Sequence, residues 1–98
     1  MKFMAILRYK DSYYALPPEK RKELMDATGQ YIEKLTKANI LKESYMLGNM
    51  KGAMAIYDMS SSEDLARLAY ESPMFSFVDV EITPLVDMDV ARKVQAKK

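Results

Sequence analysis

The stretch SPMFSFVDVEITPL, residues 72–85, reads as a β-strand whose two faces differ in chemistry. Successive side chains of a strand point to opposite faces, so residues two apart share a face. One face carries small and aliphatic side chains: Ser76, Val78, Val80 and Ile82. The other carries aromatic, acidic and hydroxyl side chains: Phe75, Phe77, Asp79, Glu81 and Thr83. Three interpretations of this acidic pair stay open. The two carboxylates are solvated, they line a pocket, or they lie at a subunit contact.

Three further strands and a long helix are predicted before this strand. Strand-like runs occupy residues 2–9, 40–47 and 53–59, and GNMKG (48–52) is typical of a hairpin connection. A helix is predicted from Glu19 to Ala38, because apolar side chains recur there at helical spacing: Leu24, Met25, Thr28, Tyr31, Ile32 and Leu35. Within this helix Gly29 predicts a close approach of helix and sheet, and Asn39 predicts a left-handed C-cap.

A second, shorter helix is predicted between the third strand and the last. The sequence SSSE (60–63) has the capping-box pattern, with Ser60 as N-cap and Glu63 three residues later. This helix is expected to run to about Glu71 and to end at Pro73, and the last strand is then expected over residues 75–83. Residues 87–98 are expected to form a short helix or a frayed tail.

The predicted order β-α-β-β-α-β is that of the ferredoxin-like α+β plan, a four-stranded antiparallel sheet with both helices on one face. A single domain over residues 1–98 is therefore predicted. The opposite face is expected to carry apolar side chains from at least three strands, including Phe75 and Phe77. An uncovered patch of that kind marks a partner site. A second copy packed face to face would give a dimeric α+β barrel, since symmetric dimers are the commonest assembly.

The composition excludes several function classes. The chain has 98 residues, a net charge of +1, no cysteine and no histidine. Disulfides, thiolate nucleophiles, Cys- or His-ligated metals and histidine bases are therefore excluded, and neither metal nor cofactor is predicted. Interspersed charges argue against a nucleic-acid partner, and the apolar run before Arg8 is too short for a membrane span or a signal peptide. The expected location is cytoplasmic.

Two segments carry a resemblance to known families. AIYDMSSSEDLARL (55–68) followed by SPMFSFVDVEITPL resembles the muconolactone isomerase family, on matching residues Tyr57, Asp58, Ser61, Leu65, Pro73, Phe75, Phe77, Asp79 and Glu81. The opening MKFMAILRYKDS is similar to that of YCII-related proteins, which share the dimeric α+β barrel superfamily. The resemblance implies a homodimer or larger homo-oligomer, and proton transfer within an unsaturated lactone without metal or cofactor. The histidine that such isomerases tend to place on the second strand is absent from residues 41–45.

Without histidine, proton transfer would fall to a carboxylate whose pKa is raised by burial or by a like charge. Glu81 and Asp79 are the candidate catalytic residues, with Glu43 in reserve. Arg8 is a candidate anion holder, because a guanidinium matches a carboxylate or enolate. The alternative for the acids is a solvated rim or ion pairs across a dimer, and for Arg8 an ordinary salt bridge.

Four aromatic residues complete the candidate substrate-binding set: Tyr45, Tyr13, Tyr14 and Phe77. Tyr45 shares a strand face with Glu43 and would donate a hydrogen bond, or the two form an exposed pair. Tyr13 and Tyr14 lie in a loop that would hang over a barrel mouth, or they pack against a partner subunit.

The leading interpretation is a muconolactone isomerase-like protein that binds a small, flat, hydrophobic or aromatic-derived molecule between sheet and helices. If it is an enzyme, the predicted chemistry is cofactor-free proton transfer. Two alternatives stay open: a cofactor-independent monooxygenase or cyclase on the same fold, and a non-enzymatic dimeric binding or assembly protein.

Overall fold

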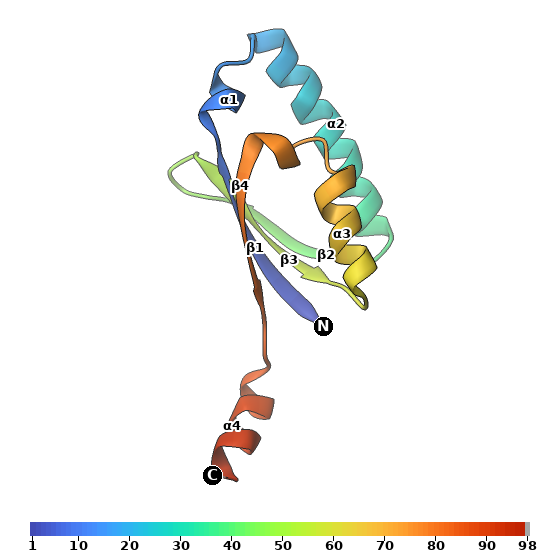
Figure 1. The fold of residues 1–98 in the computed structure, drawn as a ribbon, viewed down its shortest axis with the longest axis vertical. Helices are drawn as coiled ribbons and strands as arrows, with labels where there is room; N and C mark the ends of the chain where they lie inside the picture. The colour runs from blue at the N-terminus through green and yellow to red at the C-terminus, as the bar shows by residue number, and fades with distance from the viewer. Residues whose placement is uncertain (98) are drawn as a thin grey trace.

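The computed structural model describes residues 1–97, which form four strands, four α-helices and one 3₁₀ turn (Figure 1). Along the chain the elements are β1 (Lys2–Tyr9), α1 (Asp11–Tyr14), α2 (Pro18–Lys37), β2 (Leu41–Met46), β3 (Gly52–Asp58), α3 (Ser62–Glu71), η1 (Phe75–Phe77), β4 (Val78–Pro84) and α4 (Met88–Ala96).

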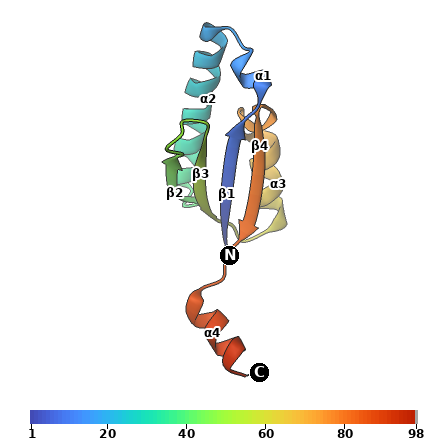
Figure 2. The same ribbon diagram turned by 90° about the vertical axis from the view of Figure 1, so that its left-hand side faces the viewer.

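The strands form one sheet in the order β2-β3-β1-β4, and all three pairings are antiparallel. Helices α2 and α3 lie on one face of this sheet, and Figure 2 looks onto the other face, which carries no helix. The predicted ferredoxin-like α+β plan is confirmed. We call the two sides the covered face and the open face.

The covered face holds the main core. It consists of buried side chains from strands β1, β2 and β3, from the residue that follows β3, and from helices α2 and α3: Ala5, Leu35, Leu41, Ala55, Tyr57, Met59 and Leu68. A smaller cluster of Tyr13, Met74 and Val78 lies at the α1 end of the sheet. In β1 and β3 the odd-numbered residues face the helices, as strand alternation requires.

Helix α2 begins at Pro18. Proline lacks an N–H group, and this costs nothing in the first turn of a helix, where N–H groups have no intrahelical acceptor. It ends before Asn39, which has a φ of 64°, so the predicted left-handed cap is confirmed. The prediction for Gly29 is wrong. A Cβ built there would meet no atom within 4 Å, so this glycine leaves space rather than permitting close contact.

The last strand begins at Val78, later than predicted, because Phe75–Phe77 form a 3₁₀ turn. The turn follows Pro73 and is closed by the amide of Phe77, which donates to the carbonyl of Met74 at 2.9 Å. Phe77 packs against the Tyr13–Met74–Val78 cluster on the covered side. Phe75 borders a depression beside Ala69 and Tyr70 of α3. The expectation that Phe75 and Phe77 contribute to the open face is therefore wrong.

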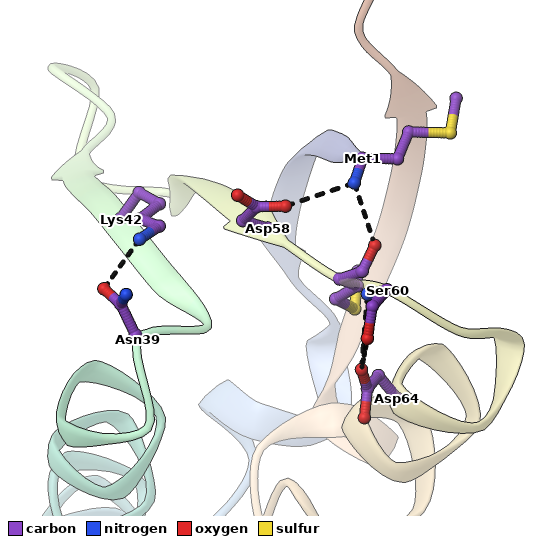
Figure 3. A network of polar contacts seen from close by, with 7 residues as sticks. Met1, Asn39, Lys42, Asp58, Ser60 and Asp64 are labelled. Carbon is purple, nitrogen blue, oxygen red and sulfur yellow. Dashed lines mark hydrogen bonds and ion pairs between the residues drawn. The ribbon is translucent and has the colours of Figure 1, made fainter.

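Helix α3 is capped one residue later than predicted. Ser61 accepts a hydrogen bond from the Asp64 amide at 3.2 Å, and the Ser60 amide donates to the Asp64 carboxylate at 3.4 Å. Figure 3 shows the Ser60–Asp64 contact beside a second one, in which the amino group of Met1 lies 3.2 Å from a carboxylate oxygen of Asp58. Asp58 thus fixes the start of β1 to the end of β3.

Helix α4 projects away from the sheet (Figure 1), and each of its residues is exposed. It occupies most of residues 87–98, for which the sequence predicted either a short helix or a frayed tail. Lys98 lies outside the described residues. None of the helices within residues 1–97 is both long and apolar enough to span a membrane.

Candidate functional site

A cavity of about 220 Å³ lies between the covered face of the sheet and the two long helices. Its floor includes β-strand residues Leu7, Ala53 and Tyr57, and its roof includes Thr28, Gly29 and Tyr31 of α2. Leu68 of α3 and Met74 close another side. The missing side chain of Gly29 and the small Ala53 and Ala55 explain physically why the helix and the sheet leave an opening here.

The lining of this cavity carries no charged side chain among the described residues. Its polar groups are hydroxyls alone, from Tyr9, Thr28, Tyr31, Ser44, Tyr57 and Ser72. The Thr28 hydroxyl is already used, because it donates to the carbonyl of Leu24 at 2.7 Å. The site therefore offers an apolar chamber with a few hydroxyl groups, which is the usual construction of a small-molecule pocket.

Tyr57 is the most deeply buried of the phenols in this lining, with 7% of its surface exposed. Burial, reinforced by the nearby Tyr31, raises the pKa of Tyr57 to about 12. Its hydroxyl makes no hydrogen bond within residues 1–97. Burial likewise raises the pKa of Tyr9 and of Tyr31 above the ordinary value, so these phenols stay protonated at neutral pH.

Three tyrosines form an aromatic cluster at the α1 end of the cavity. The rings of Tyr9 and Tyr13 stack with centroids 4.5 Å apart, and Tyr14 meets both edge-on. Tyr9 lines the cavity, whereas Tyr13 is buried behind it and Tyr14 is half exposed. The predicted residues Tyr13 and Tyr14 therefore support a cavity wall through Tyr9 without lining the cavity themselves.

The predicted catalytic acids and Arg8 lie together on the open face. The Arg8 guanidinium is 3.6 Å from the Glu81 carboxylate, and Asp79 is the register partner of Arg8 across β1 and β4. On β2 the Tyr45 hydroxyl donates to the Glu43 carboxylate at 3.0 Å. All five side chains are solvent-exposed.

The structure thus brings the predicted polar residues together in two groups, but on the other side of the sheet from the cavity. Phe77 lies apart from both groups, in a shallow depression with Leu16 and Leu24. Within residues 1–97 no cluster of three or more acidic, histidine or cysteine side chains is placed to hold a metal ion. A single chain does not unite the cavity and the carboxylates in one site.

Sequence reasoning missed Tyr57 and Tyr31 as cavity residues. In the sequence, Tyr57 stands out only through the family resemblance, and Tyr31 only through the helical apolar stripe. A signal was available for Tyr57, because it shares strand parity with Ala53 and Ala55. Two small residues beside a tyrosine on a covered face leave room around the phenol.

Comparisons with known proteins agree with the fold. The chain is similar to a crystal structure of muconolactone isomerase, with a TM-score of 0.74 and 19% identity over 89% of this chain and 90% of that one. It is also similar to 5-chloro-2-hydroxyhydroquinone dehydrochlorinase from Burkholderia phenoliruptrix AC1100, solved with 2,5-dihydroxybenzoquinone, with a TM-score of 0.70 and 12% identity over 92% of this chain and 98% of that one. The comparison with curated protein sequences gave no match.

At these identities the two structures support the fold alone. The family profile is more specific, because it matches the sequence itself over residues 1–89 and not only the shape of the backbone. It therefore covers every element from β1 to β4 and the start of α4. The chain belongs to the muconolactone delta-isomerase family.

Proposed function

We propose that this protein binds a small, flat, largely apolar molecule of one ring in the cavity between sheet and helices. The observation that carries the proposal is the size and chemistry of this space, about 220 Å³ with an apolar lining and a few hydroxyls. An apolar protein cavity of about 150 Å³ is enough to bind benzene, so this one suits a substituted ring. The dehydrochlorinase with the same fold was solved with a one-ring quinone, which agrees with this ligand class.

Binding in the cavity is tested by filling it. Gly29 lines the cavity and has open space beyond it, so Gly29→Leu is expected to occupy the ligand volume and weaken binding of ethylbenzene more than 10-fold. Gly48→Leu, in the turn between β2 and β3, is the matched control and keeps full affinity. Amide NMR titrations report both. A wild-type protein whose cavity resonances do not move with ethylbenzene contradicts the proposal.

The proposed assembly is a homodimer in which the open faces of two copies meet. Met4 and Ile6 of β1 pair in register with Ile56 and Met54 of β3, giving four half-buried apolar side chains in the centre of this face. The charged residues Arg8, Glu43, Asp79 and Glu81 surround this centre. An apolar centre inside a polar border is the usual anatomy of a protein interface.

A second candidate function is cofactor-free proton transfer, because the candidate base Glu81 and the candidate anion holder Arg8 lie 3.6 Å apart on the open face. In this scheme Glu81 is the base, Arg8 holds the enolate anion, and Asp79 or Glu43 is the alternative carboxylate. The substrate would lie where two open faces meet. Glu81→Gln is then expected to abolish isomerisation of an unsaturated lactone, while the control Glu63→Gln, on the surface of α3, leaves it intact. Unchanged turnover removes Glu81 from the mechanism.

Cofactor-free oxygenation stays as the alternative chemistry for the cavity. Oxygen uptake in the presence of a hydroquinone distinguishes it from isomerisation, because proton transfer consumes no oxygen.

A further inference from the structure

We infer that the cavity selects an uncharged ligand that bears a carbonyl group, and that the hydroxyl of Tyr57 donates a hydrogen bond to the carbonyl oxygen. This inference rests on the proposed function of the cavity. It adds the ligand's charge state, its polar group and the residue that recognises it.

The first support is the unused hydroxyl of Tyr57. Tyr57 lines the cavity with 7% of its surface exposed, and its hydroxyl has no hydrogen-bond partner within the described residues. The hydroxyl oxygen is not among the fully buried unpaired side-chain atoms of residues 1–97, so it remains accessible. The hydroxyl of a tyrosine whose ring lies in an apolar site usually finds a partner, which is water or a polar group of a bound ligand. An accessible hydroxyl that has no partner in the protein and belongs to a cavity-lining residue is therefore available to a ligand.

The second support is the direction of the hydrogen bond. Burial raises the pKa of Tyr57 to about 12, so the phenol keeps its proton at neutral pH. It then offers a donor, and the ligand must offer an acceptor. A carbonyl conjugated with a ring supplies a strong acceptor in the plane of the ring and keeps the ligand flat.

The third support is the absence of a counterion. No charged side chain lines the cavity within residues 1–97. A carboxylate ligand would lose its water of hydration without gaining an opposite charge, which costs far more than the loss of a neutral group's water.

These three observations predict discrimination between ligands of one shape. Acetophenone, ethylbenzene and benzoate share a single ring and differ in polar group and charge. The wild-type protein is expected to bind acetophenone most tightly, ethylbenzene more weakly and benzoate at least 10-fold more weakly than acetophenone.

The decisive variant is Tyr57→Phe, which removes one oxygen atom and keeps the ring. Its affinity for acetophenone is expected to fall about 3- to 10-fold, the worth of one neutral hydrogen bond, while its affinity for ethylbenzene stays unchanged. Tyr70→Phe is the matched control, because Tyr70 is 90% exposed on α3 and lies outside the cavity lining. Isothermal titration calorimetry measures all nine combinations of the three proteins and three ligands.

A measurement on the unmodified protein gives the same test independently of the variant. With tyrosine labelled by ¹³C at Cζ, acetophenone is expected to shift the Tyr57 resonance, and ethylbenzene is expected to shift it much less. Assignment comes from the resonance missing in Tyr57→Phe.

The outcomes separate this inference from the proposed function. Equal losses for acetophenone and ethylbenzene in Tyr57→Phe, or no loss for either, overturn the role of Tyr57. Benzoate binding as tightly as acetophenone overturns the selection for uncharged ligands. If none of the three probes binds to the wild-type protein, the proposed function of the cavity fails instead.

Discussion

The two faces of the sheet differ in the chemistry of the side chains that they present. Among residues 1–97, no charged side chain lines the cavity on the covered face, and the Tyr57 hydroxyl there has no partner in the protein. The open face places Met4, Ile6, Met54 and Ile56 at its centre and exposes ion pairs and hydrogen bonds around them. We propose that the first side receives a molecule without net charge and that the second meets the same face of another copy. The difference teaches that the conspicuous charged residues of a small protein need not lie where its pocket lies.

The largest expected effect concerns the open face. Ile6→Asp places a carboxylate in the middle of the proposed interface, where an isolated charge costs several kcal/mol on burial. Association between copies is expected to weaken by roughly 100-fold or more, as measured by sedimentation velocity across a concentration series. The control Ser76→Asp, exposed in the η1 turn, leaves association unchanged. A wild-type protein that stays monomeric at micromolar concentration contradicts the proposed dimer.

The next effect concerns the covered face. Leu35 is 8% exposed in the main core, so Leu35→Ala is expected to lower the free energy of unfolding by about 3 kcal/mol. Ile32 lies one turn away on the same helix and is 40% exposed, so Ile32→Ala is expected to cost less than about 1.5 kcal/mol. Urea denaturation measures both. Equal costs would mean that Leu35 is not more important to the main core than the half-exposed Ile32.

Tyr57→Phe tests the covered face through the pH dependence of the free energy of unfolding. The folded-state pKa of about 12 lies above the unfolded value of 10.0, so the folded state keeps a proton that the unfolded state loses between these pH values. Stability contributed by Tyr57 is therefore fully present below pH 10 and is lost as pH rises toward 12. The loss is of order 2 to 3 kcal/mol at the upper end.

Tyr57→Phe removes this ionisation, so its free energy of unfolding is expected to lie within about 1 kcal/mol of the wild-type value at pH 7 and to exceed it by a growing margin above pH 10. Urea denaturation at pH 7, 9 and 11 measures the margin. Tyr70→Phe, at a 90% exposed position, serves as the control and shows a constant difference. A margin for Tyr57→Phe that does not widen with pH would mean that the phenol is not held in the protonated state by the fold.

The fold followed from the sequence because periodicity is a local property. Alternation in β1 and β3 and the helical stripe of α2 each specify one element, and the order of the elements then leaves few topologies. The prediction failed where another local signal dominated, since alternation through Phe75 and Phe77 reads as strand while the chain after Pro73 closes into a 3₁₀ turn.

The candidate site followed less well, for a different reason. Sequence reasoning for proton transfer searches for charged side chains, and it found Arg8, Glu43, Asp79 and Glu81, whose role as catalytic residues stays a prediction. An uncharged cavity has no such residues to find. Its position depends on how far α2 stands from the sheet, which is a property of packing and not of any short motif. The one sequence feature that indicated the cavity is that Tyr57 shares a strand face with the small residues Ala53 and Ala55.

The smallest predicted effect isolates what Gly29 does for the covered face. Replacing a helical glycine by alanine normally stabilises a helix by about 1 kcal/mol, and a Cβ at this position would meet no atom within 4 Å. Gly29→Ala is therefore expected to raise the free energy of unfolding by up to about 1 kcal/mol, measured by urea denaturation. Gln30→Ala, at the next and exposed position, gains only a few tenths of a kcal/mol because glutamine is already a good helix former. If Gly29→Ala stabilises the protein and also weakens ethylbenzene binding, the glycine preserves ligand volume at the expense of helix stability. If it destabilises the protein, α2 needs the glycine for packing, and the open space above the sheet is smaller than the cavity described.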